Sequence, residues 1–158
     1  MAEAGFQIFL SRSLRILESE ANLAYGAVAH RLSGRRVGIA VDGERLSVSS
    51  TNAQLLVERS LAPVVAEARA SRYVLKRLLV GERELIDAVC ADEVSLQGEL
   101  EDLIAFYEAL LLYFLGAVRC PSFPEVLREF LAGVEHAAPG GAQTGSPTRV
   151  GSLRRTAS

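Results

Sequence analysis

The chain has few residues of the kinds that bind metals or form cross-links. Its 158 residues include two cysteines, Cys90 and Cys120, and two histidines, His30 and His136. The cysteines have no Cys-x-x-Cys spacing and no nearby histidine, which predicts buried, reduced thiols rather than a disulfide or a metal site. Neither histidine stands three positions after a glutamate, so the Glu-x-x-His pairs of a ferritin-like di-iron centre are missing.

Motifs for catalysis and phosphate binding are also missing. The sequence has no Gly-x-Ser-x-Gly, no phosphate-cradling glycine loop and no Gly-x-Gly-x-x-Gly. Its acids gather around expected loops and helix starts, where they suit helix dipoles and solvent better than acid/base catalysis. These acids are Glu82, Glu84, Asp92, Glu93, Glu99, Glu101 and Asp102. We therefore predict no cofactor, no metal and no catalytic residue, and we favour a protein that is not an enzyme.

No apolar run is long enough to span a membrane. The most apolar stretch, Leu103–Val118, contains Glu108 and falls short of the ~20 residues that a spanning helix needs. The first residues also lack the charged start and apolar run of a signal peptide. The net charge is −2, and because the three arginines after His136 account for +3, residues 1–136 carry −5. Such a body is a poor nucleic-acid binder, and we expect a soluble, cytoplasmic protein.

The N-terminal third begins with a helical pattern and then changes to an alternating one. Apolar residues recur every three or four positions over residues 6–32, which predicts one long amphipathic helix that Gly34 ends. Val37, Ile39 and Val41 then alternate with other residues, and a second alternating run follows the Asp-Gly pair at 42–43. An Asp-Gly pair between two such runs predicts a type I′ hairpin.

The rest of the chain predicts two more strands, at residues 54–58 and 63–70, and then mostly helices. A helix within Leu55–Ala70, with Pro63 in its first turn, is the alternative to these two strands. Ser71 suits the N-cap of a helix that Gly81 ends, and a second short helix and a brief strand at 94–97 follow. Residues 103–118 form a helix that is apolar on nearly all sides, and Pro124 suits the first turn of a last helix. This order predicts an α+β, two-layer fold, in which helices cover a mostly antiparallel sheet of about five strands.

The segment from Val74 to Tyr113 resembles the sterol carrier protein type-two family. It contains a short helix ending in Leu78-Leu79-Val80-Gly81, a second short helix, and a strand that ends in an apolar-x-Gly-Glu pattern at 96–99. The resemblance extends over about residues 36–131. The long N-terminal helix and the short segment between Val48 and Val64 depart from the family pattern.

The resemblance implies a hydrophobic tunnel between the sheet and the C-terminal helices, which would hold a fatty acyl chain or another apolar small molecule or lipid. Our candidate ligand-binding residues are Leu78, Leu79, Phe106, Leu110, Tyr113 and Phe114. Three alternatives stay open at this point. These residues are ordinary core, or they hold the substrate or cofactor of an enzyme or enzyme accessory, or the surplus apolar surface of residues 103–118 forms a homodimer interface.

The C-terminal residues Val150-Gly151-Ser152-Leu153-Arg154-Arg155 resemble the targeting peptides that load cargo into encapsulin shells. Val150 and Leu153 supply two apolar anchors, and the arginines supply charge-assisted contacts. The Leu-Thr pair that usually precedes these six residues is replaced by Thr148-Arg149. The resemblance implies an encapsulin shell protein as partner and a location inside the nanocompartment, whereas a basic tail that associates weakly with acidic surfaces is the alternative.

These patterns divide the chain into three parts. We expect a sterol-carrier-like domain with its N-terminal helix at residues 1–134 and a flexible, Gly/Pro-rich linker at 135–147. The targeting peptide then occupies residues 148–158.

Overall fold

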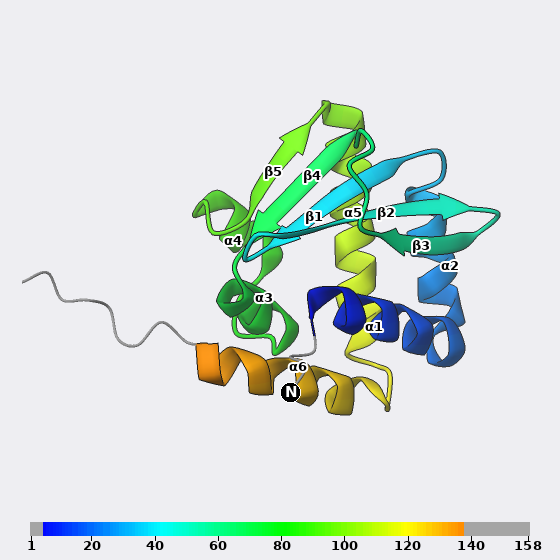
Figure 1. Cartoon of the computed structure of the whole chain (residues 1–158). Helices are drawn as coiled ribbons and strands as arrows, with labels where there is room; N and C mark the ends of the chain where they lie inside the picture. Colours follow the sequence, from blue (N-terminus) through cyan, green and yellow to red (C-terminus); the bar gives the residue numbers. More distant parts are fainter. Residues whose placement is uncertain (1–4, 138–158) are drawn as a thin grey trace, which may run out of the picture.

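The computed structural model describes residues 5–137 (Figure 1). The helices in this part of the chain are α1 (Phe6–Glu20), α2 (Asn22–Arg31), α3 (Arg72–Leu79), α4 (Leu85–Cys90), α5 (Leu100–Ala117) and α6 (Phe123–Ala137). The strands are β1 (Arg36–Val41), β2 (Glu44–Thr51), β3 (Gln54–Glu58), β4 (Ala66–Ala70) and β5 (Ser95–Gly98).

The five strands form one sheet in the order β3-β2-β1-β4-β5. β1 pairs with β4 in parallel, and the other neighbouring strands are antiparallel. All five strands form even though the segment between Val48 and Val64 is short. The expected α+β fold, with helices covering a mostly antiparallel sheet, is therefore confirmed.

The helices lie on one side of the sheet (Figure 1) and form the core with that face. Alternate residues of β1, β2 and β4 pack in the same buried cluster as α1, α2, α5 and α6. On the opposite face Arg45 of β2 bonds Glu67 of β4 at 3.0 Å, which places an ion pair across the intervening strand. Gly38 of β1 lies beneath this pair, and a Cβ there would meet the Glu67 side chain at 3.3 Å. The small residue therefore leaves room for the cross-strand pair.

The hairpin between β1 and β2 forms at the predicted Asp-Gly pair. Asp42 and Gly43 both have positive φ, of 48° and 83°, as a type I′ turn requires. The β2–β3 hairpin uses the same geometry, with φ of 52° at Asn52 and 61° at Ala53. Alanine is uncommon at positive φ, so the Asn52-Ala53 pair does not predict a turn as Asp42-Gly43 does.

The expected single helix over residues 6–32 is wrong, because the chain breaks at Ala21. The backbone of Ala21 leaves the helical region, with φ −138° and ψ 57°, and separates α1 from α2. An unbroken helix of this length would measure about 40 Å. With the break, α1 packs against α6 while α2 packs along α5, and both apolar faces reach one core.

Other local predictions have mixed outcomes. The Ser71 hydroxyl accepts a hydrogen bond of 3.1 Å from the Val74 N–H, which confirms the N-cap of α3.

Cys120 is buried, but Cys90 is exposed near the end of α4, so the prediction that both thiols are buried is wrong for Cys90. A helix as short as α4 buries only the positions that face the core. α6 runs to Ala137, past the boundary that we expected at residue 134.

None of the helices within residues 5–137 combines the length and the hydropathy that crossing a membrane requires.

A close approach between α5 and the α1–α2 pair depends on Gly116. A Cβ at this position would lie 2.7 Å from Leu17 Cδ1 and 2.8 Å from Ala24 Cβ. Both distances are far below an ordinary carbon–carbon contact. Gly26 of α2 has no atom within 4 Å of the corresponding point, so a methyl group fits there.

Gly116→Ala and Gly26→Ala are therefore expected to change stability in opposite directions. Both substitutions improve helix propensity, which at Gly26 raises the free energy of unfolding by about 0.5–1 kcal/mol. At Gly116 the clash outweighs this gain and lowers the free energy of unfolding by about 1–3 kcal/mol. Urea denaturation of the two variants measures the difference. Equal stabilisation by both would show that α5 does not pack this closely.

Candidate functional site

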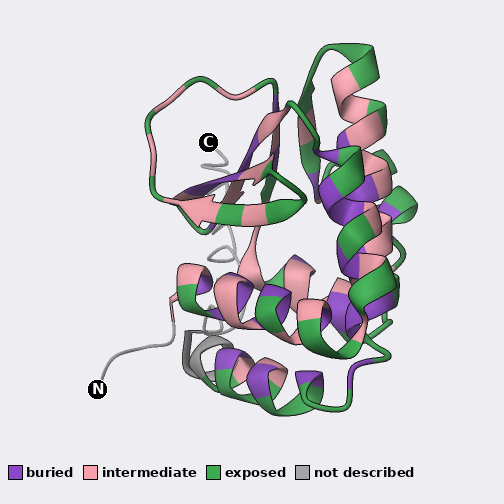
Figure 2. Cartoon of the chain, turned by 90° about the vertical axis from the view of Figure 1, so that its right-hand side faces the viewer, coloured by how far each residue is buried: buried purple, intermediate pink, exposed green. Residues whose placement is uncertain are grey.

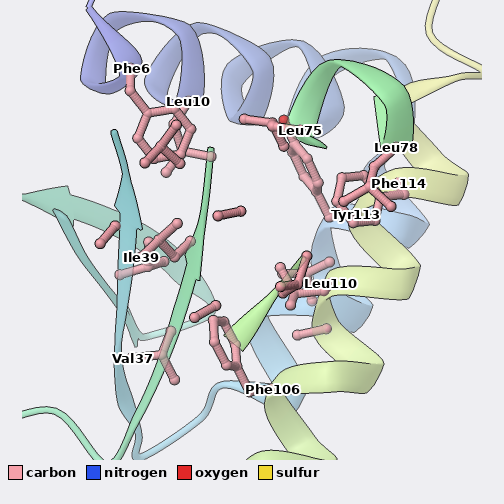
Figure 3. A pocket seen from close by; sticks show the side chains of 18 of the residues that line it. Phe6, Leu10, Val37, Ile39, Leu75, Leu78, Phe106, Leu110, Tyr113 and Phe114 are labelled. Carbon is pink, nitrogen blue, oxygen red and sulfur yellow. The ribbon is translucent and has the colours of Figure 1, made fainter. Parts of the chain in front are cut away.

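An apolar cavity of about 90 Å³ lies between the sheet and the helices. Figure 3 shows side chains from three directions converging on it: Val37 and Ile39 from β1, Phe6 and Leu10 from α1, and residues of α3 and α5 from the opposite side. Almost the whole wall is hydrocarbon. This arrangement can solvate an apolar group.

The secondary structure explains why these residues meet. Val37, Ile39 and Val41 alternate along β1, so all three point to the helical side of the sheet. Phe106 and Tyr113 lie seven residues apart on α5, which brings both rings to the side of the helix that faces the sheet.

Several lining side chains lack complete packing. Ile39, Leu75, Leu78 and Leu110 line the cavity and are only half-buried. Part of their apolar surface therefore has no protein atom against it. Such surface is the kind that an apolar molecule covers favourably.

Five of the six predicted ligand-binding residues line this cavity. They are Leu78, Phe106, Leu110, Tyr113 and Phe114. Leu79 is buried in the main core but does not belong to the wall. A ligand-binding role for any of the six stays a prediction, because lining a cavity and binding a molecule are different properties.

The sequence interpretation missed the other half of the wall. α1 contributes Phe6, Phe9, Leu10 and Leu14, and the sheet contributes Val37, Ile39, Val41, Val48, Leu55 and Ala68. The periodicity of these residues marked them as facing a core. It carried no signal that the core has an unfilled space beside them.

A buried hydrogen bond adjoins the cavity. The hydroxyl oxygens of Ser13 on α1 and Tyr113 on α5 lie 2.7 Å apart, and the Ser13 hydroxyl is also 2.9 Å from the Leu10 carbonyl oxygen. When Ser13 donates to that carbonyl, Tyr113 donates to Ser13. Burial raises the pKa of the Tyr113 phenol well above its ordinary value, and the Ser13 hydrogen bond opposes this only in part. The phenol therefore stays neutral and ties α1 to α5.

Charged groups hold the end of α1 that carries Phe6. The Glu44 carboxylate accepts hydrogen bonds from the Phe6 N–H at 3.0 Å and the Gln7 N–H at 3.3 Å, in the position of an N-terminal cap. Arg59 approaches the same carboxylate at 2.9 Å and Arg72 approaches it at 3.8 Å. One acid of the β1–β2 hairpin thus anchors the first turn of α1 beside the cavity.

The predicted acidic residues lie away from the cavity wall. Asp102 pairs with Arg35 at 2.9 Å, and Glu93 pairs with Arg83 at 2.9 Å. None of the seven acids lines the cavity. Within residues 5–137 no group of three or more His, Cys, Asp or Glu side chains is arranged to hold a metal ion.

Comparison with solved structures gives the same architecture. The chain matches a solution structure of sterol carrier protein domain 2 of Helicoverpa armigera with a TM-score of 0.54 and 11% identity, over 77% of this chain and 97% of that one. It matches a ubiquinone synthesis protein, UbiJ-SCP2, with a TM-score of 0.51 and 20% identity, over 67% and 85% of the two chains. The chain has the sterol-carrier fold.

A third structure, apo sterol carrier protein 2 from Yarrowia lipolytica, matches with a TM-score of 0.50 and 11% identity, over 67% of this chain and 89% of that one. No protein-family model and no curated protein sequence matches. The three structural matches confirm the resemblance to sterol carrier proteins for the fold alone. The expected targeting peptide, Val150 to Arg155, lies outside the described residues.

Tyr113→Phe is expected to alter the pH dependence of stability. The pKa of Tyr113 is higher in the folded state than in the unfolded state, where it is about 10. The contribution of Tyr113 to the free energy of unfolding is therefore complete below pH ~10 and is lost as the pH rises further. The free energy of unfolding should fall above pH ~10 by up to about 1.4 kcal/mol per pH unit in the parent chain, and less steeply in the variant.

At neutral pH the same variant should lose about 1 kcal/mol with the Ser13 hydrogen bond. Burial also raises the pKa of the Cys120 thiol, and the charge of Cys120 contributes to the raised pKa of Tyr113. The comparison therefore measures Tyr113 together with its interaction with Cys120. Denaturation curves from pH 7 to about 11 test the prediction. If the free energy of unfolding falls equally steeply above pH ~10 in both proteins, the prediction is wrong.

Proposed function

We propose that this protein binds an apolar ligand in the cavity between its sheet and its helices. The observation that carries the proposal is the incompletely packed, hydrocarbon wall within a sterol-carrier fold. Covering such a wall is favourable by roughly 25 cal/mol for each Å² of apolar surface removed from water. The similar structures are named as sterol carrier proteins and a ubiquinone synthesis protein, which supports the same class of ligand.

The size of the cavity limits what it holds without rearrangement. Its 90 Å³ is well below the ~300–1,000 Å³ of sites for drug-sized ligands. A fatty acyl chain therefore requires the wall to open. Leu75, Leu78 and Leu110 of α3 and α5 are half-buried, so a change of rotamer costs them less packing than it would cost a fully buried side chain.

Filling the cavity should prevent binding. Ala109 of α5 is buried and lines the wall, so Ala109→Leu places a larger side chain in the space that a ligand would occupy. We expect at least a tenfold weaker affinity for a fluorescent fatty acid such as cis-parinaric acid, or about 1.4 kcal/mol. Fluorescence titration measures this loss.

Ala132→Leu is the matched control, because Ala132 is an exposed residue of α6 outside the cavity wall. This control should bind as the parent does. Native mass spectrometry and lipid extraction of the purified parent chain identify any ligand that it carries. Absence of copurified lipid together with no titratable binding of the fatty acid would overturn the proposal.

We propose further that residues 148–155 load this binding domain into an encapsulin shell. The support is chemical: two apolar residues, Val150 and Leu153, three positions apart, are followed by two arginines. Apolar anchors in shallow pockets and charge-assisted hydrogen bonds are how a short peptide gains both affinity and orientation. In this proposal the ligand-binding domain is cargo, and the shell protein is its partner.

A chain ending at Ser146 is expected to lose packaging when it is co-expressed with a cognate encapsulin shell. Leu153→Ala should reduce loading several-fold through the loss of one apolar anchor, whereas Thr156→Ala, outside the six-residue motif, should load normally. Cargo copurifying with assembled shells provides the measurement. If the chain ending at Ser146 is packaged as well as the full chain, the targeting proposal fails while the ligand-binding proposal remains.

A further inference from the structure

The segment that joins β4 to β5 forms a unit of its own at one side of the cavity. It comprises residues 71–94, with α3, α4 and the turns around them, and Figure 1 shows both helices at the end of the sheet where β4 ends and β5 begins. Arg83 bonds Glu93 at 2.9 Å within the segment. The segment also has a small core, which consists of Val74, Leu85, Ala88 and Val94. We call residues 71–94 the α3–α4 unit.

The two connections of the α3–α4 unit to the sheet lie side by side. β4 ends at Ala70 and β5 begins at Ser95, and Ser95 is paired with Arg69 in the sheet. The hydrogen bonds that residues 71–94 make within the described part of the chain all stay inside the unit. A movement of the whole unit about its two neighbouring connections therefore breaks none of these bonds.

The α3–α4 unit forms part of the cavity wall that faces the sheet. Leu75 and Leu78 of α3 line the space (Figure 3), and Leu85 and Val94 of the unit line it as well. Where the unit meets α5, the side chains that pack against its small core are only half-buried. These side chains include Leu110, Leu111 and Phe114. The contact between the unit and α5 is therefore loosely packed.

The other helical walls of the cavity are held more firmly. α1 and α6 lie side by side, with buried positions where they meet (Figure 2), and the rings of Phe9 and Phe130 are 4.3 Å apart. Glu44 holds the first turn of α1. Ser13 and Gly116 mark the contacts that join α1 to α5. The α3–α4 unit is therefore the wall that opens with the least loss of contacts.

Two side chains of α3 attach the unit to the rest of the protein. Leu79 is buried in the main core, and the guanidinium carbon of Arg72 lies 5.4 Å from the centre of the Phe130 ring on α6. Arg72 also approaches Asp42 and Glu44 of the β1–β2 hairpin, at 3.8 Å in each case. Both distances exceed those of a hydrogen bond, so these ion pairs attract Arg72 without fixing its position.

We propose that the α3–α4 unit is a lid that opens to admit the apolar ligand, and that Arg72 is the latch that keeps it closed. The inference rests on the proposed function, because it concerns entry to the same cavity. Opening moves Leu75 and Leu78 away from the wall and enlarges a space that is too small for an acyl chain when the lid is closed. Closing returns Leu79 to the main core and Arg72 to its two carboxylates.

Arg72→Met tests the latch. The substitution keeps an apolar side chain beside Phe130 and removes the charge that Asp42 and Glu44 attract. The lid then opens more often in the free and in the loaded protein alike. We expect the rate constants for ligand entry and exit to rise by the same factor, about threefold or more, with an unchanged Kd. Stopped-flow fluorescence with cis-parinaric acid measures both rate constants.

Arg31→Met is the matched control, because Arg31 pairs with Glu108 at 2.9 Å and lies outside both the α3–α4 unit and the cavity wall. Its rate constants should equal those of the parent. Urea denaturation shows that both variants are folded. If Arg72→Met changes neither rate constant, or changes only one of them and with it the Kd, the lid proposal fails while ligand binding remains.

The reactivity of a buried thiol tests the lid without any ligand. In a Cys90→Ser background, Leu79→Cys introduces a thiol that a maleimide reaches when the lid opens, while the buried Cys120 reports on unfolding of the rest of the protein. Mass spectrometry of labelled peptides follows both thiols. Adding Arg72→Met should speed labelling of the introduced thiol about threefold and leave the rate at Cys120 unchanged.

The two experiments separate the two proposals. Equal acceleration at both thiols, or no acceleration at the introduced one, overturns the lid whether or not the protein binds a fatty acid. If the parent binds no fatty acid, the proposed function fails, and selective acceleration at the introduced thiol still establishes that the α3–α4 unit opens with Arg72 as its latch.

Discussion

The packing of α5 is the constraint on which the rest of the structure depends. Its inner side carries Phe106 and Tyr113, which face the sheet across the cavity. Gly116 brings the end of the helix against Leu17 and Ala24, so α1 and α2 are held at a distance that a larger residue would not allow. The hydrogen bond between Tyr113 and Ser13 makes the same connection with a polar contact. A helix held this firmly can be apolar on most sides and still have one defined position.

The cavity exists because these attachments are at its edges. Glu44 ties the first turn of α1 to the β1–β2 hairpin, and Gly116 and Ser13 tie α1 to α5, which leaves the centre between Ile39 and Leu110 without a fixed contact. Close-packed interiors rarely keep such spaces, because each unfilled contact costs dispersion energy. In the proposed function a ligand supplies the missing contacts, and the protein gains stability when it binds.

The local features of this protein followed from its sequence by itself. The alternation of Val37, Ile39 and Val41, the Asp42-Gly43 turn and the Ser71 cap each depend on neighbouring residues, and each was found where the pattern predicted it. The break at Ala21, the exposure of Cys90 and the separation of Leu79 from the cavity wall were not predictable. No glycine or proline marks the break, and periodicity reports which side of an element is apolar without saying what lies opposite. The cavity was decided only by the tertiary structure, because its volume depends on the distance at which α1, α5 and the sheet are held by contacts between residues far apart in the chain.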